Sequence, residues 1–321
     1  MDMKIPDRFT YDYILKGTLL AALPLLLASC FTGIESTKKI TMTREERTQT
    51  LPTAEDKYLA DIRPDRYTDW LPGKRFLVAD ARAGILIQPR FPAEAAPLKA
   101  GDIISFHDAS MRRMPDGSQR PVLTFVSDGG EYLYEGLSGV AARDTVGGTE
   151  ITGLIDPELV ERVDARLRGK TVWTLTTIWQ TPEGERLPGR KFIPVTIDSV
   201  VPGTMVYPLL VDFHDADGRA GHFLMNLTLT GRESRGFQAL FTLEDPRLRH
   251  PEITDAVWAA ICSATVAEGM TKEECRLSKG NPAETGAGHN YSSTLLVWKY
   301  ADGTVLYFID DILRGINSVP T

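Results

Sequence analysis

The chain has 321 residues and a formal net charge of −7, with 25% charged and 8% aromatic residues. This acidic balance lacks the clustered lysine and arginine of a nucleic-acid-binding surface, so nucleic acid is excluded as a partner. The length and a hydrophobic content of 42% suffice for two or three domains with buried cores.

The first thirty residues have the pattern of an export signal. A basic stretch precedes an apolar segment at 17–27, and Leu27-Ala-Ser-Cys30 follows. The apolar segment is about half of the roughly twenty residues that a helix needs to span a bilayer, so it predicts a cleaved signal peptide at 1–29. Leu27 to Cys30 resembles the bacterial lipobox, in which the cysteine thiol is acylated before cleavage.

The lipobox resemblance implies an exported lipoprotein of a Gram-negative-type bacterium, with lipid such as palmitate on Cys30. Each buried CH₂ contributes about 0.8 kcal/mol, so more than one acyl chain anchors a protein stably without a spanning helix. We expect the outer membrane of the cell envelope, facing either the periplasm or the surface. The alternative is a secretory signal cut after Ser29 with Cys30 unmodified; either version is exported.

Residues 30–65 are polar and charged, with few large apolar side chains and no sustained periodicity. Such a composition predicts a flexible tether, with one short helix near 54–60.

Residues 66–148 change to short β-branched and aromatic runs bounded by glycine, proline and aspartate. Strands are predicted at 75–79, 85–87, 102–106, 121–126 and 131–134. Five short strands in about sixty residues suit a small barrel-like module.

A connecting helix begins the next predicted domain, 149–246. Asp156 suits the N-cap, Pro157 suits the first helical position, and Gly169 suits the helix end. Apolar residues share one helical face: Leu159, Val160, Val163 and Leu167. Strands of a second β-rich module are then predicted at 171–179, 191–197, 207–213 and 222–227.

Two short sequence echoes link the β-rich modules. Gly73-Lys-Arg-Phe76 is echoed by Gly189-Arg-Lys-Phe192, and Ile104–Asp108 by Val211–Asp215, with offsets that differ by nine residues. Two interpretations stay open: a duplicated barrel-like module, or chance combined with the common requirements of β-hairpins.

Residues 247–321 predict a lobe with two helices followed by three strands. Ile253, Val257, Trp258, Ile261 and Val266 approximate a helical stripe that Gly269 ends. Thr271 and Glu274 have capping-box spacing for a second helix, which runs to about Gly280. Apolar runs at 293–300, 304–309 and 312–316 predict the strands. The fold class is therefore α+β, with a mainly antiparallel β region followed by an ααβββ lobe.

Three segments of this lobe resemble the SmpA/OmlA/BamE family of outer-membrane lipoproteins: Gly269-Met-Thr-Lys-Glu-Glu-Cys275, Gly280-Asn-Pro282 and Val297-Trp-Lys-Tyr300. The resemblance covers less than a quarter of the chain and implies a non-catalytic, protein-contacting module beside outer-membrane assembly machinery. The upstream β region departs from the family pattern. The whole chain also resembles lipoproteins of Bacteroides-type bacteria, through Cys30-Phe-Thr-Gly-Ile-Glu-Ser36 and its layout, which implies no activity.

Cys262 and Cys275 lie seven residues before and six residues after Gly269, which would place them at one level of a helical hairpin. In an oxidising compartment this favours a disulfide between them. The alternatives are two buried thiols that act as small hydrophobic side chains, or, least favoured, a reactive thiol.

No metal site is predicted. Four residues of one hairpin are weak candidates for metal ligands: His214, Asp215, Asp217 and His222. Imidazoles and carboxylates across a hairpin can bind one ion, but this spacing matches no ligand pattern and equally suits a turn. No cofactor is predicted either.

Other candidate catalytic groups have plain structural interpretations. His107-Asp108 and Asp310-Asp311 suit solvated turns, and Gly136-Leu-Ser-Gly139 lacks the spacing of a nucleophile elbow. The aromatic set Trp173, Trp179, Tyr207 and Phe213 could line a groove but is more typical of a core. We therefore predict a non-catalytic interaction or assembly module with an envelope protein as partner; the alternative is an envelope hydrolase acting on glycan or peptide.

Overall fold

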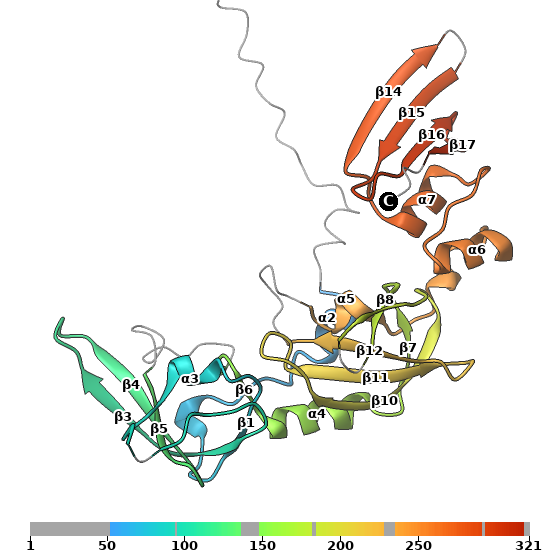
Figure 1. Ribbon diagram of the computed structural model, residues 1–321. Helices are drawn as coiled ribbons and strands as arrows, with labels where there is room; N and C mark the ends of the chain where they lie inside the picture. The colour runs from blue at the N-terminus through green and yellow to red at the C-terminus, as the bar shows by residue number, and fades with distance from the viewer. Residues whose placement is uncertain are drawn as a thin grey trace, which may run out of the picture. The chain divides into compact units, whose positions relative to one another are not determined.

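The computed structural model describes residues 52–93, 95–135, 148–181, 184–227, 235–290 and 293–317. Its strands form three separate sheets of six, seven and four strands, in which neighbouring strands run antiparallel (Figure 1). Helices are few and short beside them. The predicted α+β class with a mainly antiparallel β region is confirmed.

The first sheet has the strand order β2-β5-β4-β3-β1-β6. Its strands are β1 (Arg75–Val78), β2 (Ile87–Pro89), β3 (Ile103–Arg113), β4 (Gln119–Ser127), β5 (Gly130–Glu135) and β6 (Leu154–Ile155). The short helices η1 (Tyr67–Asp69) and α3 (Ala83–Leu86) precede β1 and β2. Trp70 packs against Phe76 with ring centroids 4.7 Å apart and anchors an aromatic core. Because β6 pairs with β1, this sheet extends beyond the predicted boundary at residue 148.

Helix α4 (Pro157–Leu167) has the cap and the buried face that the sequence predicts. The Asp156 carboxylate accepts hydrogen bonds from the backbone N–H groups of Glu158 (3.0 Å) and Leu159 (3.4 Å). The four predicted apolar residues are all buried, and they pack into the core of the second sheet. Gly169, with φ of +73°, follows the helix end.

The second sheet has the order β13-β7-β10-β11-β12-β8-β9. Its strands are β7 (Thr171–Thr174), β8 (Ile178–Gln180), β9 (Arg186–Pro188), β10 (Pro194–Pro202), β11 (Leu209–Asp215), β12 (Ala220–Met225) and β13 (Phe241–Thr242). Helix α5 (Phe237–Leu240) precedes β13, and η2 (Pro246–Arg249) follows it. Helix α2 (Ala54–Tyr58) confirms the short helix expected in the tether, but Leu59 and Ile62 after it are buried in this core.

The second sheet curls like part of a barrel. Strands β7 and β8 lie four places apart in the sheet, which would separate them by about 19 Å if it were flat. The chain from Thr174 to Ile178 spans at most about 14 Å. The sheet must therefore curve so that β7 and β8 approach each other, and the single strand predicted at 171–179 is interrupted where the chain crosses.

The strand predicted at 85–87 is also wrong, because α3 occupies most of it. The Asp80 carboxylate accepts a hydrogen bond from the Arg82 backbone N–H (2.8 Å), and the Asp80 carbonyl accepts one from Ala83 N–H (2.9 Å). These bonds fold the chain into a helical turn, and the strand begins only at Ile87.

The first two sheets share one topology. The order β6-β1-β3-β4-β5-β2 in the first matches β13-β7-β10-β11-β12-β8 in the second, strand for strand, in both chain order and sheet order. Strand β9, which pairs with β8, is an addition to the second sheet. The two β-rich modules are therefore structural repeats.

Equivalent backbone hydrogen bonds fix the correspondence. Gly73-Lys74 exchanges two hydrogen bonds with Phe106, each of 2.7 Å, and Gly169-Lys170 exchanges the same two with Ile197, of 2.8 and 3.0 Å. Both glycines have positive φ, +94° and +73°. Gly73-Lys74 thus corresponds to Gly169-Lys170, so the predicted echo at Gly189 does not mark the repeat.

The repeats also share a β-bulge at the same register. Pairing of β3 with β4 shifts between Phe106 and Asp108, and pairing of β10 with β11 shifts between Ile197 and Ser199. The bulge lies at the same position in both strands, counted from the first residue of β3 and from the first residue of β10. The second predicted echo matched β3 to β11, which are not equivalent strands.

The C-terminal lobe contains α6 (Asp255–Cys262), α7 (Lys272–Lys279) and a sheet of β14 (Glu284–Asn290), β15 (Ser293–Lys299), β16 (Val305–Ile309) and β17 (Ile312–Asn317) in that order. Thr271 and Glu274 form the predicted capping box, each side chain accepting from the other's backbone N–H (3.2 and 2.6 Å). The lobe is therefore ααββββ, with β14 added to the predicted ααβββ order.

Candidate functional site

Two candidate segments lie outside the described residues. They are the lipobox cysteine, Cys30, and Gly136–Gly139. Lipidation of Cys30 stays a prediction.

The four metal candidates of the β11–β12 hairpin do not converge. His214 and Asp215 are consecutive on β11, so their side chains point to opposite faces, that of His214 outward (43% exposed) and Asp215 inward. The Asp215 carboxylate instead accepts hydrogen bonds from the backbone N–H groups of Asp217 (3.0 Å) and Arg219 (2.9 Å) and so organises the turn. In the part of the chain that the structure describes, no set of three ligand groups gathers here.

A serine, an aspartate and a histidine are connected on the outer face of the second sheet. Asp212 accepts a hydrogen bond from Ser199 Oγ (2.6 Å) through one carboxylate oxygen, and its other oxygen lies 2.6 Å from His222 Nδ1. The carboxylate stands between the hydroxyl and the imidazole. A serine nucleophile needs the imidazole in that middle place to take its proton, so this order does not activate Ser199.

A second histidine–aspartate pair lies nearby, with His214 Nδ1 2.8 Å from Asp198. Asp198 is the bulged residue of β10, and His107 is the bulged residue of β3, its structural counterpart. Asp310 and Asp311 form the β16–β17 turn, both with left-handed backbone (φ 48° and 69°), as a tight hairpin requires.

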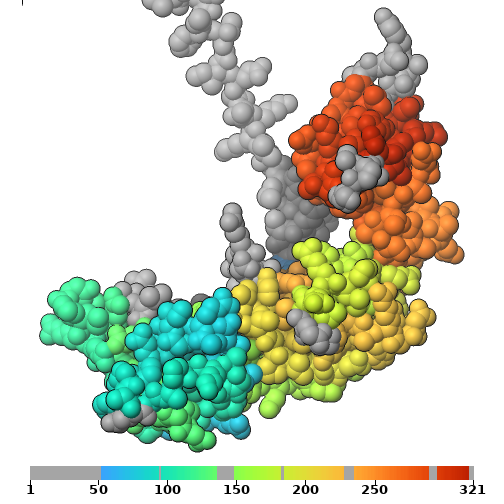
Figure 2. Space-filling view, in the orientation of Figure 1, coloured from blue at the N-terminus to red at the C-terminus, as the bar shows by residue number. Residues whose placement is uncertain are grey.

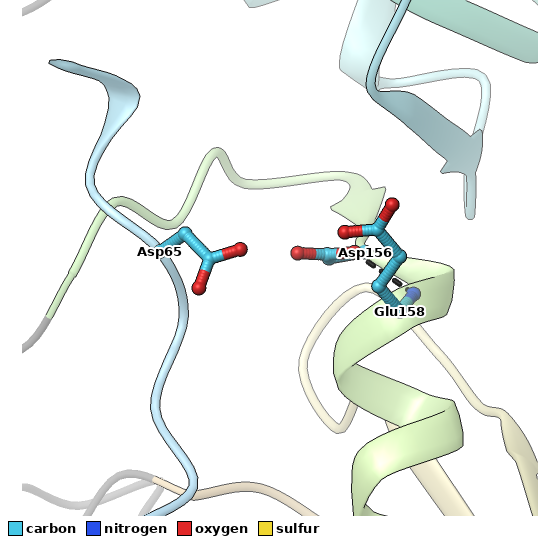
Figure 3. A group of neighbouring side chains, drawn as sticks. All are labelled: Asp65, Asp156 and Glu158. Atoms are coloured by element: carbon cyan, nitrogen blue, oxygen red, sulfur yellow. Dashed lines mark hydrogen bonds between the residues drawn. The ribbon is translucent and has the colours of Figure 1, made fainter. Parts of the chain in front are cut away.

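Three carboxylates meet at the start of α4. Asp65 lies on an extended segment, while Asp156 and Glu158 lie at the helix start, with their carboxylates turned toward one another (Figure 3). The ammonium group of Lys74 lies among them, 3.1 Å from Asp65, 3.0 Å from Asp156 and 2.6 Å from Glu158. This cluster is therefore a compensated ion-pair network in which a lysine takes the place a cation would need.

The network favours the charged lysine. Burial of Lys74 opposes its charge, but hydrogen bonds to Glu158 and Asp156 outweigh burial and raise the pKa of Lys74 above its ordinary value of 10.5. Since Lys74 directly precedes β1 and its partners lie at the start of α4 and on the chain before η1, the network fastens the first repeat to the connecting helix.

The two cysteines are free and buried, in different cores. Cys262 packs in the core of the second sheet, and Cys275 packs in the core of the C-terminal lobe. Burial raises the pKa of Cys262 and raises that of Cys275 to about 12, so both thiols are held protonated. The predicted disulfide stays a prediction.

Lys191 caps the end of α7. Its ammonium group donates hydrogen bonds to the carbonyls of Leu277 and Ser278 (2.6 Å for the second), and its backbone N–H donates to the Cys262 carbonyl (2.9 Å). Burial lowers the pKa of Lys191 to about 8. An open cavity of about 530 Å³ lies beside it, with Tyr300 and Lys279 also in its wall. Lys279 is paired with Asp302 (2.8 Å), and the lysines therefore serve the structure of the lobe.

Two of the four residues of the aromatic set belong to the core, whereas Trp173 and Tyr207 are half-buried outside the core clusters of the described residues. Trp179 and Phe213 are fully buried and meet edge to face with ring centroids 5.0 Å apart. A second cavity, of about 390 Å³, is lined instead by Phe192, Phe241 and Trp258. Glu55 in its wall already accepts hydrogen bonds from Thr242 Oγ1 (2.8 Å) and Leu243 N–H (3.1 Å), so the cavity is mainly apolar.

The C-terminal sheet has a second apolar surface, opposite the one that packs on its core. Cross-strand pairing places these side chains on it: Leu295 and Val297 of β15, Val305, Tyr307 and Ile309 of β16, and Ile312 of β17. Gly286, Gly288 and Gly315 complete it. We call this set the apolar face. Leu295, Tyr307 and Ile309 are 37–40% exposed, and none of the apolar face belongs to a core cluster of the described residues.

The sequence itself contains a signal for this face. Leu295-Leu-Val-Trp298 and Val305-Leu-Tyr-Phe-Ile309 are apolar at every position rather than at alternate ones. Such a run is typical of a strand that is covered on both faces. Figure 2 shows the lobe in orange to red.

None of the described helices is long and apolar enough to cross a membrane. Comparison of the chain with family models, with curated proteins and with solved structures gave no match.

Proposed function

We propose that the protein is an exported lipoprotein, anchored in the outer membrane through lipid on Cys30, whose folded part binds another envelope protein without catalysing a reaction. The observation that supports the binding role is the apolar face of the C-terminal sheet. The largest exposed apolar patch of a soluble monomer, typically about 300–600 Å², is often a binding surface.

Two sequence features support the rest of the proposal. The basic stretch, the short apolar segment and Leu27-Ala-Ser-Cys30 support export and lipidation. The resemblance of Gly269–Cys275, Gly280–Pro282 and Val297–Tyr300 to the SmpA/OmlA/BamE family supports a protein-contacting lobe in the envelope.

The anchor is tested by separating membrane and soluble fractions of cells that make the wild type, Cys30→Ala or Thr32→Ala. We expect the wild type and Thr32→Ala, which keeps the lipobox, in the outer-membrane fraction, and Cys30→Ala outside it. Full membrane retention of Cys30→Ala contradicts the lipid anchor.

The binding role is tested by crosslinking the anchored protein in intact cells and identifying the captured protein. Reproducible capture of one envelope protein is expected. If none is captured, and the purified protein hydrolyses a glycan or peptide substrate in a way that His222→Ala abolishes, the hydrolase alternative replaces this proposal.

A further inference from the structure

The apolar face is one of two apolar surfaces on the same small sheet. The opposite surface carries Trp298, Leu306, Phe308 and Leu313, each at most 2% exposed, packed with residues of α6 and α7. The apolar face carries side chains of the same kind but has no described element packed on it. Among the described residues the lobe therefore has two layers, the sheet and the helices α6 and α7, and the second surface of the sheet stays uncovered.

Glycines shape the apolar face. A Cβ atom built on Gly286 or Gly288 would meet nothing within 4 Å, so β14 forms an open trough beside Val297 and Leu295. At Gly315 the nearest atom to such a Cβ is Tyr307 Cδ2, at 3.7 Å, so the tyrosine ring lies toward β17. The surface is therefore flat over β16 and β17 and recessed over β14.

The charges that border this surface are balanced. Lys299 lies 3.5 Å from Glu284 at one end, and Lys272 lies 2.6 Å from Asp311 at the other. The remaining charges of the adjoining turn and strand are Asp310 and Arg314. An anionic bilayer is bound by surfaces with an excess of lysine and arginine, so a protein fits this surface better than a membrane does.

The area of the apolar face argues against a second copy of this chain as the partner. Four strands about 4.8 Å apart and five residues of about 3.4 Å rise give roughly 19 by 17 Å, or about 320 Å². A stable dimer needs about 800 Å² from each partner, so a second copy seated here would bury less than half of what it needs. An α-helix about 10 Å wide covers the same length with about twelve residues.

We propose that the apolar face binds an amphipathic α-helix of an envelope protein, laid along β14 and β15 with large apolar side chains in the trough above Gly286 and Gly288. This inference rests on the proposed interaction function. The helix supplies the third layer of the lobe.

The test places a photocrosslinking amino acid at Tyr307, at Leu295 and, as a control, at the exposed Glu273 of α7, in the full lipid-anchored chain in intact cells. The crosslinked peptides are then sequenced. We expect one envelope-protein segment with apolar residues at i, i+3, i+4 and i+7, captured from Tyr307 and Leu295 and not from Glu273. Capture of a second copy, of lipid, or of this chain's residues 31–51 contradicts the proposal.

A steric variant gives an independent readout. Gly286→Phe fills the trough, and its backbone φ and open surroundings accept a side chain without strain. It should lower the yield of the Tyr307 crosslink by about tenfold or more, while Gly286→Ala should not. Unchanged melting curves of both variants establish that they fold. An undiminished crosslink in Gly286→Phe overturns the inference.

Positions on the second sheet separate this inference from the proposed function. If a crosslinker at His214 captures an envelope protein while the apolar face captures none, the interaction function stands and the helix site is wrong. If no position captures a protein, both are wrong.

Discussion

Phe192 occupies, in the second β-rich module, the place that Gly101 occupies in the first. Phe192 N–H donates to the Thr174 carbonyl (2.6 Å), as Gly101 N–H donates to the Val78 carbonyl (2.9 Å), and both have left-handed backbone with φ of 58° and 93°. The ring of Phe192 stacks on Trp258 of α6 with centroids 5.7 Å apart. The stacking contact therefore offsets a strain of about 1–3 kcal/mol that glycine avoids.

This relationship predicts an unusual order of stabilities at Phe192. Both Phe192→Ala and Phe192→Gly lose the ring contact, at a cost of about 2–3 kcal/mol for a partly buried phenylalanine. Glycine also relieves the left-handed strain, so Phe192→Gly should be more stable than Phe192→Ala by about 1 kcal/mol. Denaturant unfolding measures both. The exposed Ile178 of β8, at which alanine should be the better tolerated, is the control, and the same order at both sites would contradict the strain.

The sequence predicts those elements whose local chemistry agrees with their place in the fold. Asp156-Pro157 determines where α4 begins, and Thr271 with Glu274 determines where α7 begins, because each cap is satisfied by nearby backbone groups. Strand β14 was missed because Gly286 and Gly288 give it little β propensity, and only pairing with β15 makes it a strand.

The repeat could not be located from residue identities. Equivalent positions are often different residues, such as Gly101 and Phe192 or Ile87 and Trp179, because only backbone hydrogen bonds and burial are shared. The side chains at equivalent positions of the two repeats can differ freely, because only the backbone geometry is common to both repeats. The Gly-Lys pairs at residues 73 and 169, and Phe125 with Phe213, are identities that remain at equivalent positions.

Lys74 is predicted to be essential for stability. Lys74→Met leaves three carboxylates without their common cation and should destabilise the protein by about 3 kcal/mol at neutral pH. Lys74→Met combined with Glu158→Gln should recover part of the loss, because one negative charge is removed. Since the folded pKa of Lys74 is raised above 10.5, its contribution is complete at lower pH and is lost only as pH rises through that raised value. A wild-type melting temperature for Lys74→Met at pH 7 would rule out this role.

Calcium should distinguish the variant from the wild type. In Lys74→Met the carboxylates of Asp65, Asp156 and Glu158 keep oxygens within 4.8 Å of one another, without the ammonium group. Such oxygens suit Ca²⁺, so millimolar Ca²⁺ should raise the melting temperature of Lys74→Met more than that of the wild type. Lys57→Met, which alters an exposed lysine outside the network, is the control. Equal shifts in all three proteins would show that the cluster does not bind the ion.

The lowered pKa of Lys191 predicts that the free energy of unfolding increases as the pH becomes alkaline. Its pKa is lowered by burial from 10.5 to about 8, so between these values the folded protein has released a proton that the unfolded chain still holds. Stability should therefore increase from pH 8 to 10, by about 1–2 kcal/mol after allowance for solvent screening. A neutral amine retains two N–H groups, enough for the carbonyls of Leu277 and Ser278. Unfolding of wild type and Lys191→Met at several pH values isolates the effect, and parallel profiles would refute it.

The thiols give a prediction that also decides between a disulfide and two buried thiols. In Cys30→Ala protein, native Cys262 and Cys275 should resist iodoacetamide at pH 8, because both are buried and their pKa values are raised, that of Cys275 to about 12. Denaturation without a reducing agent should then expose two reactive thiols, since the side chains pack in separate cores. Finding none until reductant is added would establish the disulfide expected from their spacing. It would also require α6 and α7 to bring Cys262 out of the core of the second sheet, which would weaken the contact between that sheet and the lobe.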